Sequence, residues 1–98
     1  MKIPKKIKVA GHIYKIKFDD KKLFKERLFG QADFIQTTIR ISKKYDKTKR
    51  AKSEIERTLM HEIVHVVDRH YNNCVLGEKT VARLSEGLYQ VLKDNFHL

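Results

Sequence analysis

The chain has 98 residues, a single cysteine and a formal net charge of +10, and a length this short predicts one domain, residues 1–98, with a small core. One thiol excludes an internal disulfide, and no apolar run approaches the ~18 residues of a membrane span. The N-terminal MKIPKKIKV lacks the apolar segment of a signal peptide, so a cytoplasmic protein is expected.

The N-terminal half alternates apolar and polar residues in the manner of β-strands. KKIKVAGHIYKIKF, residues 5–18, predicts a β-hairpin with Gly11 in its turn. Residues 19–29 have apolar side chains at helical spacing and predict a short helix or an ordered loop. TTIRIS, residues 37–42, alternates again and indicates a further strand, which a basic connection over residues 43–52 follows.

Two helices are predicted in the second half, where apolar residues recur every three or four positions. Ser53 and Glu56 have the spacing of a capping box, in which each side chain satisfies a free backbone N–H, so a helix is expected over residues 53–72. NNCVLG then breaks the pattern, and a second helix is expected over residues 78–95. Strands followed by helices predict a compact α+β domain.

The first of these helices carries TLMHEIVH, in which His61 and His65 bracket Glu62. Residues four apart share one helix face, so both imidazoles can reach one ion. Zinc accepts neutral histidine nitrogens and keeps a position for water in catalytic sites. Glu62 is placed to take a proton from that water and return it to a leaving amine. The HExxH spacing predicts a metallopeptidase; the alternative is a structural histidine pair on an amphipathic helix.

The third zinc ligand lies outside this motif. The longer metzincin pattern HExxHxxGxxH fails, because Asp68 and Tyr71 stand where a glycine and a histidine are needed. Asp68 is about 10 Å along the helix axis from His61, too far for a short side chain, and is interpreted as a partner of a ligand or as a surface ion pair. The ligand is therefore expected on the last helix, where Glu78 and Glu86 are candidates.

The motif resembles that of the zincins, and among them small phage and mobile-element proteins related to the ImmA/IrrE-type metallopeptidases. TLMHEIVH, a short gap and a final helix such as VARLSEGLYQVLKDN are similar to that pattern. The resemblance implies a minimal zincin-like domain of gluzincin type, with Glu78 as the third ligand, although Thr80 stands where a second acidic residue is common. It also implies that residues 37–42 form an edge strand that pairs with extended substrate.

Several further polar residues are candidates for lesser roles. A donor that stabilises the transition state is usual in this chemistry, and the sequence offers Tyr71, Tyr89 and His97. Three other residues that could bind metal are not needed by the motif and are interpreted as bystanders: His12, His70 and Cys74.

The sequence thus predicts a zinc-dependent endopeptidase that uses His61, His65 and Glu78 as ligands and Glu62 as general base. The resemblance implies a cytoplasmic enzyme that cleaves a protein substrate, such as a repressor. The alternative is a binding module with a structural zinc. Residues 1–50 carry 16 Lys and Arg against 5 Asp and Glu, whereas residues 51–98 carry 6 against 7. This basic half favours nucleic acid or an acidic protein as a partner, unless its charges are only solvated strand faces and loops.

Overall fold

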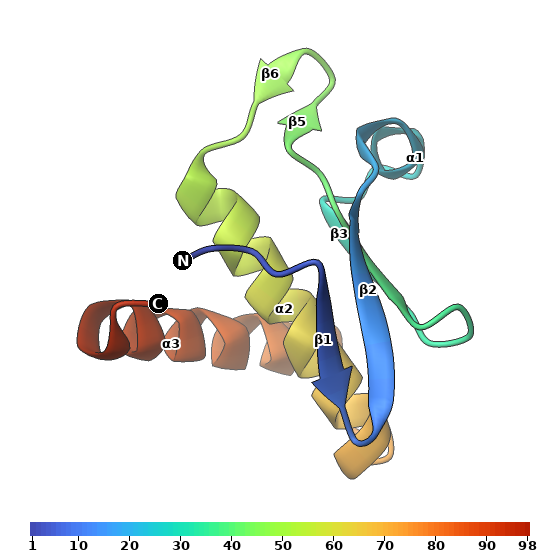
Figure 1. Ribbon diagram of the computed structural model, residues 1–98, viewed down its shortest axis with the longest axis vertical. Helices are drawn as coiled ribbons and strands as arrows, with labels where there is room; N and C mark the ends of the chain where they lie inside the picture. Colours follow the sequence, from blue (N-terminus) through green and yellow to red (C-terminus); the bar gives the residue numbers. More distant parts are fainter.

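The computed structural model describes all residues, 1–98, and has a sheet on one side and two long helices on the other (Figure 1). The sheet contains β1 (Lys6–Val9), β2 (His12–Phe18), β4 (Thr38–Ile41) and β3 (Gly30–Asp33), in that spatial order. β1 and β3 run antiparallel to their neighbours, whereas β2 and β4 are parallel. The predicted α+β class is confirmed.

The helices and a second small hairpin complete the chain. α1 (Asp20–Lys25) follows β2, and β5 (Lys44–Tyr45) pairs with β6 (Thr48–Lys49). α2 (Lys52–Tyr71) packs on the sheet, and α3 (Glu78–Phe96) packs on α2, so α2 is the middle layer (Figure 1). None of the helices combines the length and the apolar character that crossing a membrane requires.

The predicted hairpin of residues 5–18 is confirmed as β1 and β2. Val9 is paired with His12, so the loop is the two residues Ala10 and Gly11, with φ angles of 51° and 81°. Positive φ at both positions is the geometry that matches the twist of the flanking strands, and glycine adopts it without steric cost. His12 is therefore the first residue of β2.

The region after Gly30 contains more strands than the sequence predicted. The chain turns back between β3 and β4, where the Asp33 carboxylate accepts hydrogen bonds from the backbone N–H groups of Ile35 and Gln36. Such a side-chain turn competes with a continuing strand. The basic connection of residues 43–52 likewise contains the β5–β6 hairpin. The strands β3, β5 and β6 are short and have few apolar residues, so the sequence shows no apolar alternation from which they could be predicted.

The edge-strand prediction for residues 37–42 is wrong. β4 lies between β2 and β3, with Ile39 and Ile41 fully buried, whereas β3 pairs only with β4 and has a free outer edge. The alternating isoleucines from which the strand was predicted are buried in the core, as expected for a central strand. The polar GQAD of β3 belongs to the exposed edge.

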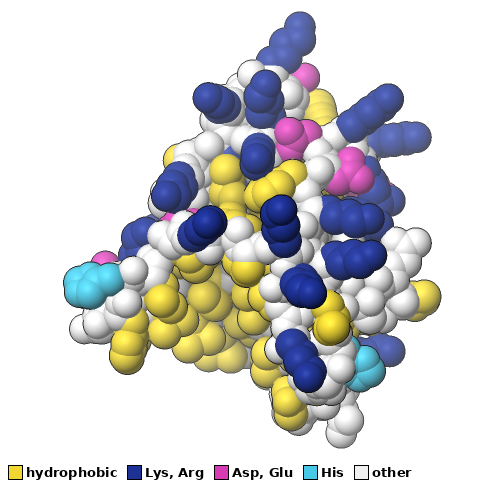
Figure 2. Space-filling view, in the orientation of Figure 1, with side chains coloured by type: hydrophobic (Ala, Val, Ile, Leu, Met, Phe, Trp, Pro, Cys, Tyr) yellow, Lys and Arg dark blue, Asp and Glu magenta, His cyan; other side chains and the backbone are white.

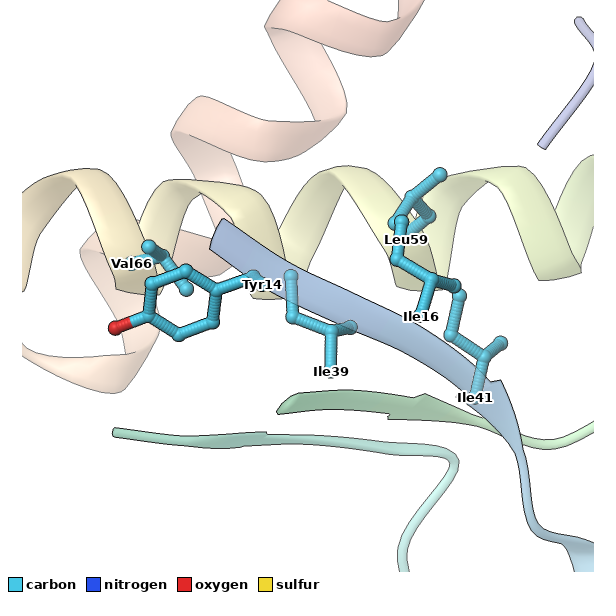
Figure 3. Close-up of a cluster of buried hydrophobic side chains, with 6 residues drawn as sticks. All are labelled: Tyr14, Ile16, Ile39, Ile41, Leu59 and Val66. Carbon is cyan, nitrogen blue, oxygen red and sulfur yellow. The ribbon is translucent and has the colours of Figure 1, made fainter. Parts of the chain in front are cut away.

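The main core lies between α2 and the sheet (Figure 3). Strand side chains alternate between faces, so β2 and β4 each bury every second residue, while α2 contributes residues two turns apart. Each buried side chain of this size stabilises the fold by roughly 1.5–3 kcal/mol relative to exposure. The six side chains of this cluster are Tyr14, Ile16, Ile39, Ile41, Leu59 and Val66. They fix which face of α2 is turned away from the sheet.

The capping-box prediction is wrong, because α2 begins at Lys52 with Ala51 as its N-cap and without a side-chain capping hydrogen bond. The Glu56 carboxylate, 1% exposed, points into the interface between α2 and α3 instead. It accepts hydrogen bonds from the Tyr89 hydroxyl at 2.6 Å and the Lys93 ammonium at 3.2 Å, and it pairs with the Met1 amine at 3.1 Å. Two cations and a hydroxyl compensate a buried carboxylate better than one backbone N–H would.

The hydrogen bonds and ion pairs of Glu56 make the free energy of unfolding depend on pH in the acidic range. Burial raises the pKa of Glu56, but the hydrogen bonds from Tyr89, the Met1 amine and Lys93 outweigh it and lower the pKa to about 2. Because the folded pKa lies below the unfolded value of about 4.3, the stabilisation is present above that pH and is lost as the pH falls through 2.

We expect the difference in unfolding free energy between the wild-type protein and Glu56→Gln to shrink as the pH falls from about 4.3 towards 2, as measured by urea titration. Asp94→Asn removes an exposed carboxylate from the neighbouring helix α3 and should follow the wild type. A difference for Glu56→Gln that stays constant over this range would contradict the assignment.

Candidate metal centre

His61 and His65 lie one turn apart on α2 and face the first residue of α3, Glu78. The two Nε2 atoms are 3.2 Å apart, and they lie 2.6 Å and 2.9 Å from the Glu78 carboxylate oxygens. The imidazoles are about three-quarters buried, whereas the Glu78 side chain is 68% exposed. Three ligand atoms thus converge on one point, all within 4.8 Å of one another.

This group could hold a metal ion, and its donors fit zinc. Two nitrogens bound to one tetrahedral zinc at about 2.0–2.1 Å would be about 3.3 Å apart, close to the 3.2 Å that separates the two Nε2 atoms. Two imidazoles and one carboxylate form a set that zinc accepts, and three protein ligands leave a fourth position open.

The α2–α3 connection, which positions Glu78, is held by Asp68. The buried Asp68 carboxylate accepts hydrogen bonds from the Asn72 side chain and the backbone N–H of Leu76, and its backbone carbonyl accepts from the N–H of Cys74. It forms no ion pair and no hydrogen bond with a histidine, so both roles expected from the sequence are wrong. Its influence on the site passes through the connection, whose Leu76 lies two residues before Glu78.

Glu62 lies beside the histidines and faces β3, with only 7% of its surface exposed. Burial and, to a smaller extent, the Glu78 carboxylate raise the pKa of Glu62, whereas a hydrogen bond from the Ala32 backbone lowers it; the net pKa is about 8. A cation held between the histidines would favour the ionised form of Glu62, because opposite charges stabilise each other. The carboxylate is therefore held in a dry position with its protonation set by the neighbouring charges.

The position of Glu62 depends on a close approach between β3 and α2 at Gly30. A Cβ atom added to Gly30 would lie 2.5 Å from the Thr58 methyl carbon and 3.1 Å from the Glu62 carboxylate. Only glycine leaves room for both. The sequence gives no sign of this packing role, because Thr58 and Glu62 are 28 and 32 positions from Gly30.

A cleft of about 360 Å³ opens beside His61 and Glu78, two of the three residues that could ligate a metal. It extends along the first half of α2 to the connection between α1 and β3, and arginines and carboxylates line it more than apolar side chains do. Beyond the metal-ligating group, its lining includes Arg27, Phe29, Arg50, Thr58, Ala82 and Glu86. The cleft gives an elongated ligand access to the open side of the metal-ligating group.

The structure distinguishes the two candidates for the third ligand. Glu86 lines the cleft, but its carboxylate lies 3.6 Å from Arg57 Nε and is not among the atoms that converge with the histidines. Glu78 is in that group because it begins α3, directly after the connection that Asp68 holds. Glu78 therefore completes the cluster, and Glu86 belongs to an ion pair further along the cleft.

The other predicted candidates lie away from the cleft. The Tyr89 hydroxyl donates to Glu56, the Tyr71 side chain is 70% exposed, and His97 ends α3 with a φ angle of 56°. None of these three lines the cleft. The bystanders are also elsewhere: the His12 and His70 rings stack at 4.5 Å, and Cys74 is exposed in the α2–α3 connection.

Comparisons of the chain with protein-family models, with curated proteins and with solved structures give no match. The class of site therefore follows from its own geometry. It is a group of two histidines and a carboxylate that could hold a metal, beside a buried glutamate and an open cleft, in a small α+β domain.

Glu78→Gln should weaken zinc binding by more than about tenfold, since the loss of even an outer partner of a ligand costs that much. Glu86→Gln is the matched control, because it removes the same charge from the same helix and cleft, and it should retain the wild-type affinity. Competition with a chromogenic zinc chelator measures both. Equal losses of zinc affinity in the two variants, or a loss in Glu86→Gln alone, would show that Glu78 is not the third ligand.

Gly30→Ala should destabilise the fold by roughly 1–3 kcal/mol, the usual cost of overpacking. The added Cβ pushes β3 away from Thr58 and Glu62. Thr58→Ser removes the methyl group but keeps the hydroxyl that binds Arg50, so the double variant should recover most of the loss in chemical denaturation. A double variant no more stable than Gly30→Ala would locate the strain elsewhere.

Proposed function

We propose that the protein is a zinc-dependent endopeptidase of the zincin type, with His61, His65 and Glu78 as zinc ligands and Glu62 as general base. The observation that carries this proposal is the convergence of both Nε2 atoms and the Glu78 carboxylate on one point, beside the buried Glu62. Such a constellation has the donors that bind zinc and a separate carboxylate that can move a proton.

Each residue has a distinct task in peptide hydrolysis. Zinc, when bound, polarises the scissile carbonyl and acidifies the attacking water. Glu62 accepts the proton that this water loses and delivers it to the amine that leaves, so one carboxylate serves first as base and then as acid. The low exposure of Glu62 supports this role, because a dry carboxylate exchanges its proton less readily with bulk water.

The free edge of β3 is where an extended peptide would bind. An edge strand offers unpaired backbone N–H and C=O groups, to which a peptide can add as a further strand. Because Gly30 packs against Glu62, a peptide along this edge passes close to the general base. β3 thus takes the part that the sequence had suggested for residues 37–42.

The open geometry favours catalysis over a binding module with a structural zinc. Structural zinc sites are closed by four protein ligands, whereas catalytic sites have three and keep one position open. The cluster offers three ligand atoms, and the third belongs to a side chain that is 68% exposed at the cleft. The basic half of the chain is compatible with either function and does not decide between them.

Glu62→Gln should abolish proteolysis while leaving about one zinc per chain, because the amide keeps the shape of the side chain but cannot accept a proton. General-base catalysis contributes typically about 10²–10⁴-fold, so a loss in kcat of that order is expected with a fluorescently labelled unfolded protein as substrate. Glu26→Gln, at the exposed end of α1, is the control. Proteolysis that survives Glu62→Gln would sink the proposal.

A further inference from the structure

Three arginines line the cleft beside the metal centre, and only one of them is neutralised. Arg57 pairs with Glu54 at 2.7 Å and with Glu86 at 3.6 Å. Neither Arg27 nor Arg50 takes part in any ion pair of the chain. The end of the cleft formed by these two residues therefore has two cations without a direct ion pair, although the carboxylates of Glu54 and Asp20 act on Arg50 from further away.

Arg50 is held in place by neutral oxygens. Its guanidinium donates to the Ser42 carbonyl at 2.8 Å and hydroxyl at 3.0 Å, to the Thr58 hydroxyl at 2.6 Å and to the Glu54 carbonyl at 3.2 Å. Its carbon Cζ also lies 4.6 Å from the centre of the Phe29 ring. Burial lowers the pKa of Arg50, but an arginine stays charged at neutral pH. The side chain is thus a rigid cation, and its position is fixed before any ligand arrives.

The distance between Arg50 and Glu62 suits neighbouring residues of one peptide. Thr58, which binds Arg50, precedes Glu62 by one helical turn, about 6 Å along the axis of α2. Successive residues of an extended peptide are about 3.3–3.4 Å apart. A peptide bond next to Glu62 therefore has the residues one or two positions away beside the Arg50 guanidinium.

Arg27 adds a second cation on the outer wall of the same end. It lies in the connection between α1 and β3, with a φ angle of 59°, and the backbone N–H groups of Arg27 and Leu28 are bound to carbonyls of α1. This connection also carries Phe29 into the cleft. Its fixed backbone holds the exposed Arg27 side chain near the edge of β3, where a peptide would enter.

The surrounding surface reinforces this charge. Figure 2 shows Lys and Arg side chains gathered over the strand-rich half of the molecule, and residues 1–50 have an excess of 11 positive charges, 16 against 5. Such a field speeds the approach of anionic partners. Inside the cleft, however, Glu54, Glu62, Glu78 and Glu86 add carboxylates that would repel a chain of phosphates. The combination suits a single acidic side chain better than nucleic acid.

We propose that this end of the cleft, with Arg50 and Arg27, binds an aspartate or glutamate side chain of the substrate within two residues of the scissile bond. This inference rests on the proposed peptidase function. The exposed Arg27 donates a charge-assisted hydrogen bond to the carboxylate, and Arg50, whose Nη groups already donate to protein oxygens, contributes its positive charge. Both favour acidic sequences, while the zinc site carries out the hydrolysis. The protein then cleaves next to acidic residues.

The experiment begins with the zinc-loaded protein and a pool of proteome-derived peptides whose termini are blocked. Mass spectrometry identifies the cleaved bonds, and Asp or Glu should be enriched at one fixed position within two residues of them. The best-cleaved peptide is then compared with its Glu→Gln or Asp→Asn counterpart, and kcat/KM should fall about tenfold. Cleavage without such enrichment would overturn the inference while leaving the peptidase intact.

Variants locate the selectivity. Arg50→Gln and Arg27→Gln should each reduce the preference for the acidic peptide, whereas Arg50→Lys, which keeps the charge, should retain most of it. Because Arg50 also bridges β4 and α2, the exposed Arg27 provides a variant with little risk to folding. Lys8→Gln on β1 removes the same charge outside the cleft and should leave the preference unchanged. A preference that none of the cleft variants alters would overturn the assignment.

A binding experiment tests the proposed carboxylate site independently of the proposed peptidase activity. If the zinc-loaded protein cleaves nothing, binding is measured with two ten-residue peptides, both acetylated and amidated, that differ only in a central Glu-Glu or Gln-Gln pair. Tighter binding of the Glu-Glu peptide that weakens in Arg27→Gln supports the carboxylate site without the peptidase. Equal binding, a requirement for a free C-terminus, or stronger Arg27-dependent binding of a short DNA duplex would each overturn it.

Discussion

The helix α2 packs against the sheet on one face and against α3 on another, and the positions of the other functional side chains depend on this double packing. Leu59 and Val66 bury one face of it in the sheet, while His61 and His65 are turned towards α3. The angular spacing of side chains on a helix is fixed, so packing the first pair determines the direction of the second. The sheet thereby orients the histidines without contacting them.

Glu62, the proposed general base, depends on a different contact of the same helix. Glu62 follows His61 directly, so it projects to a different side of α2 and meets β3, where Gly30 lets the strand approach. Strand and helix together exclude water from the carboxylate, and this burial is the main cause of its raised pKa. Because β3 is an edge strand, one of its edges pairs with β4, and its other edge is free for the peptide that we propose as substrate.

Charges along the cleft are only partly paired. Arg57 pairs with Glu54 and Glu86, whereas Arg27 and Arg50 form no ion pair. The hydrogen bonds of Arg50 go instead to neutral oxygens of α2 and of Ser42, the residue after β4. Glu56, by contrast, satisfies its charge inside the fold through contacts with Tyr89, Lys93 and the amine of Met1.

The sequence by itself determined the features that depend on neighbours along the chain. The two-residue turn of the first hairpin and the spacing of His61, Glu62 and His65 follow from local backbone geometry, which hardly changes with context. Residue spacing left Glu78 and Glu86 open, and a resemblance alone favoured Glu78, which the tertiary structure brings to the histidines. Only the tertiary structure made β3 the edge strand and directed Glu56 to Tyr89. Glu78 is 13 and 17 residues from the two histidines, and Tyr89 is 33 residues from Glu56. Contacts at such separations depend on how whole elements pack, which residue spacing does not encode.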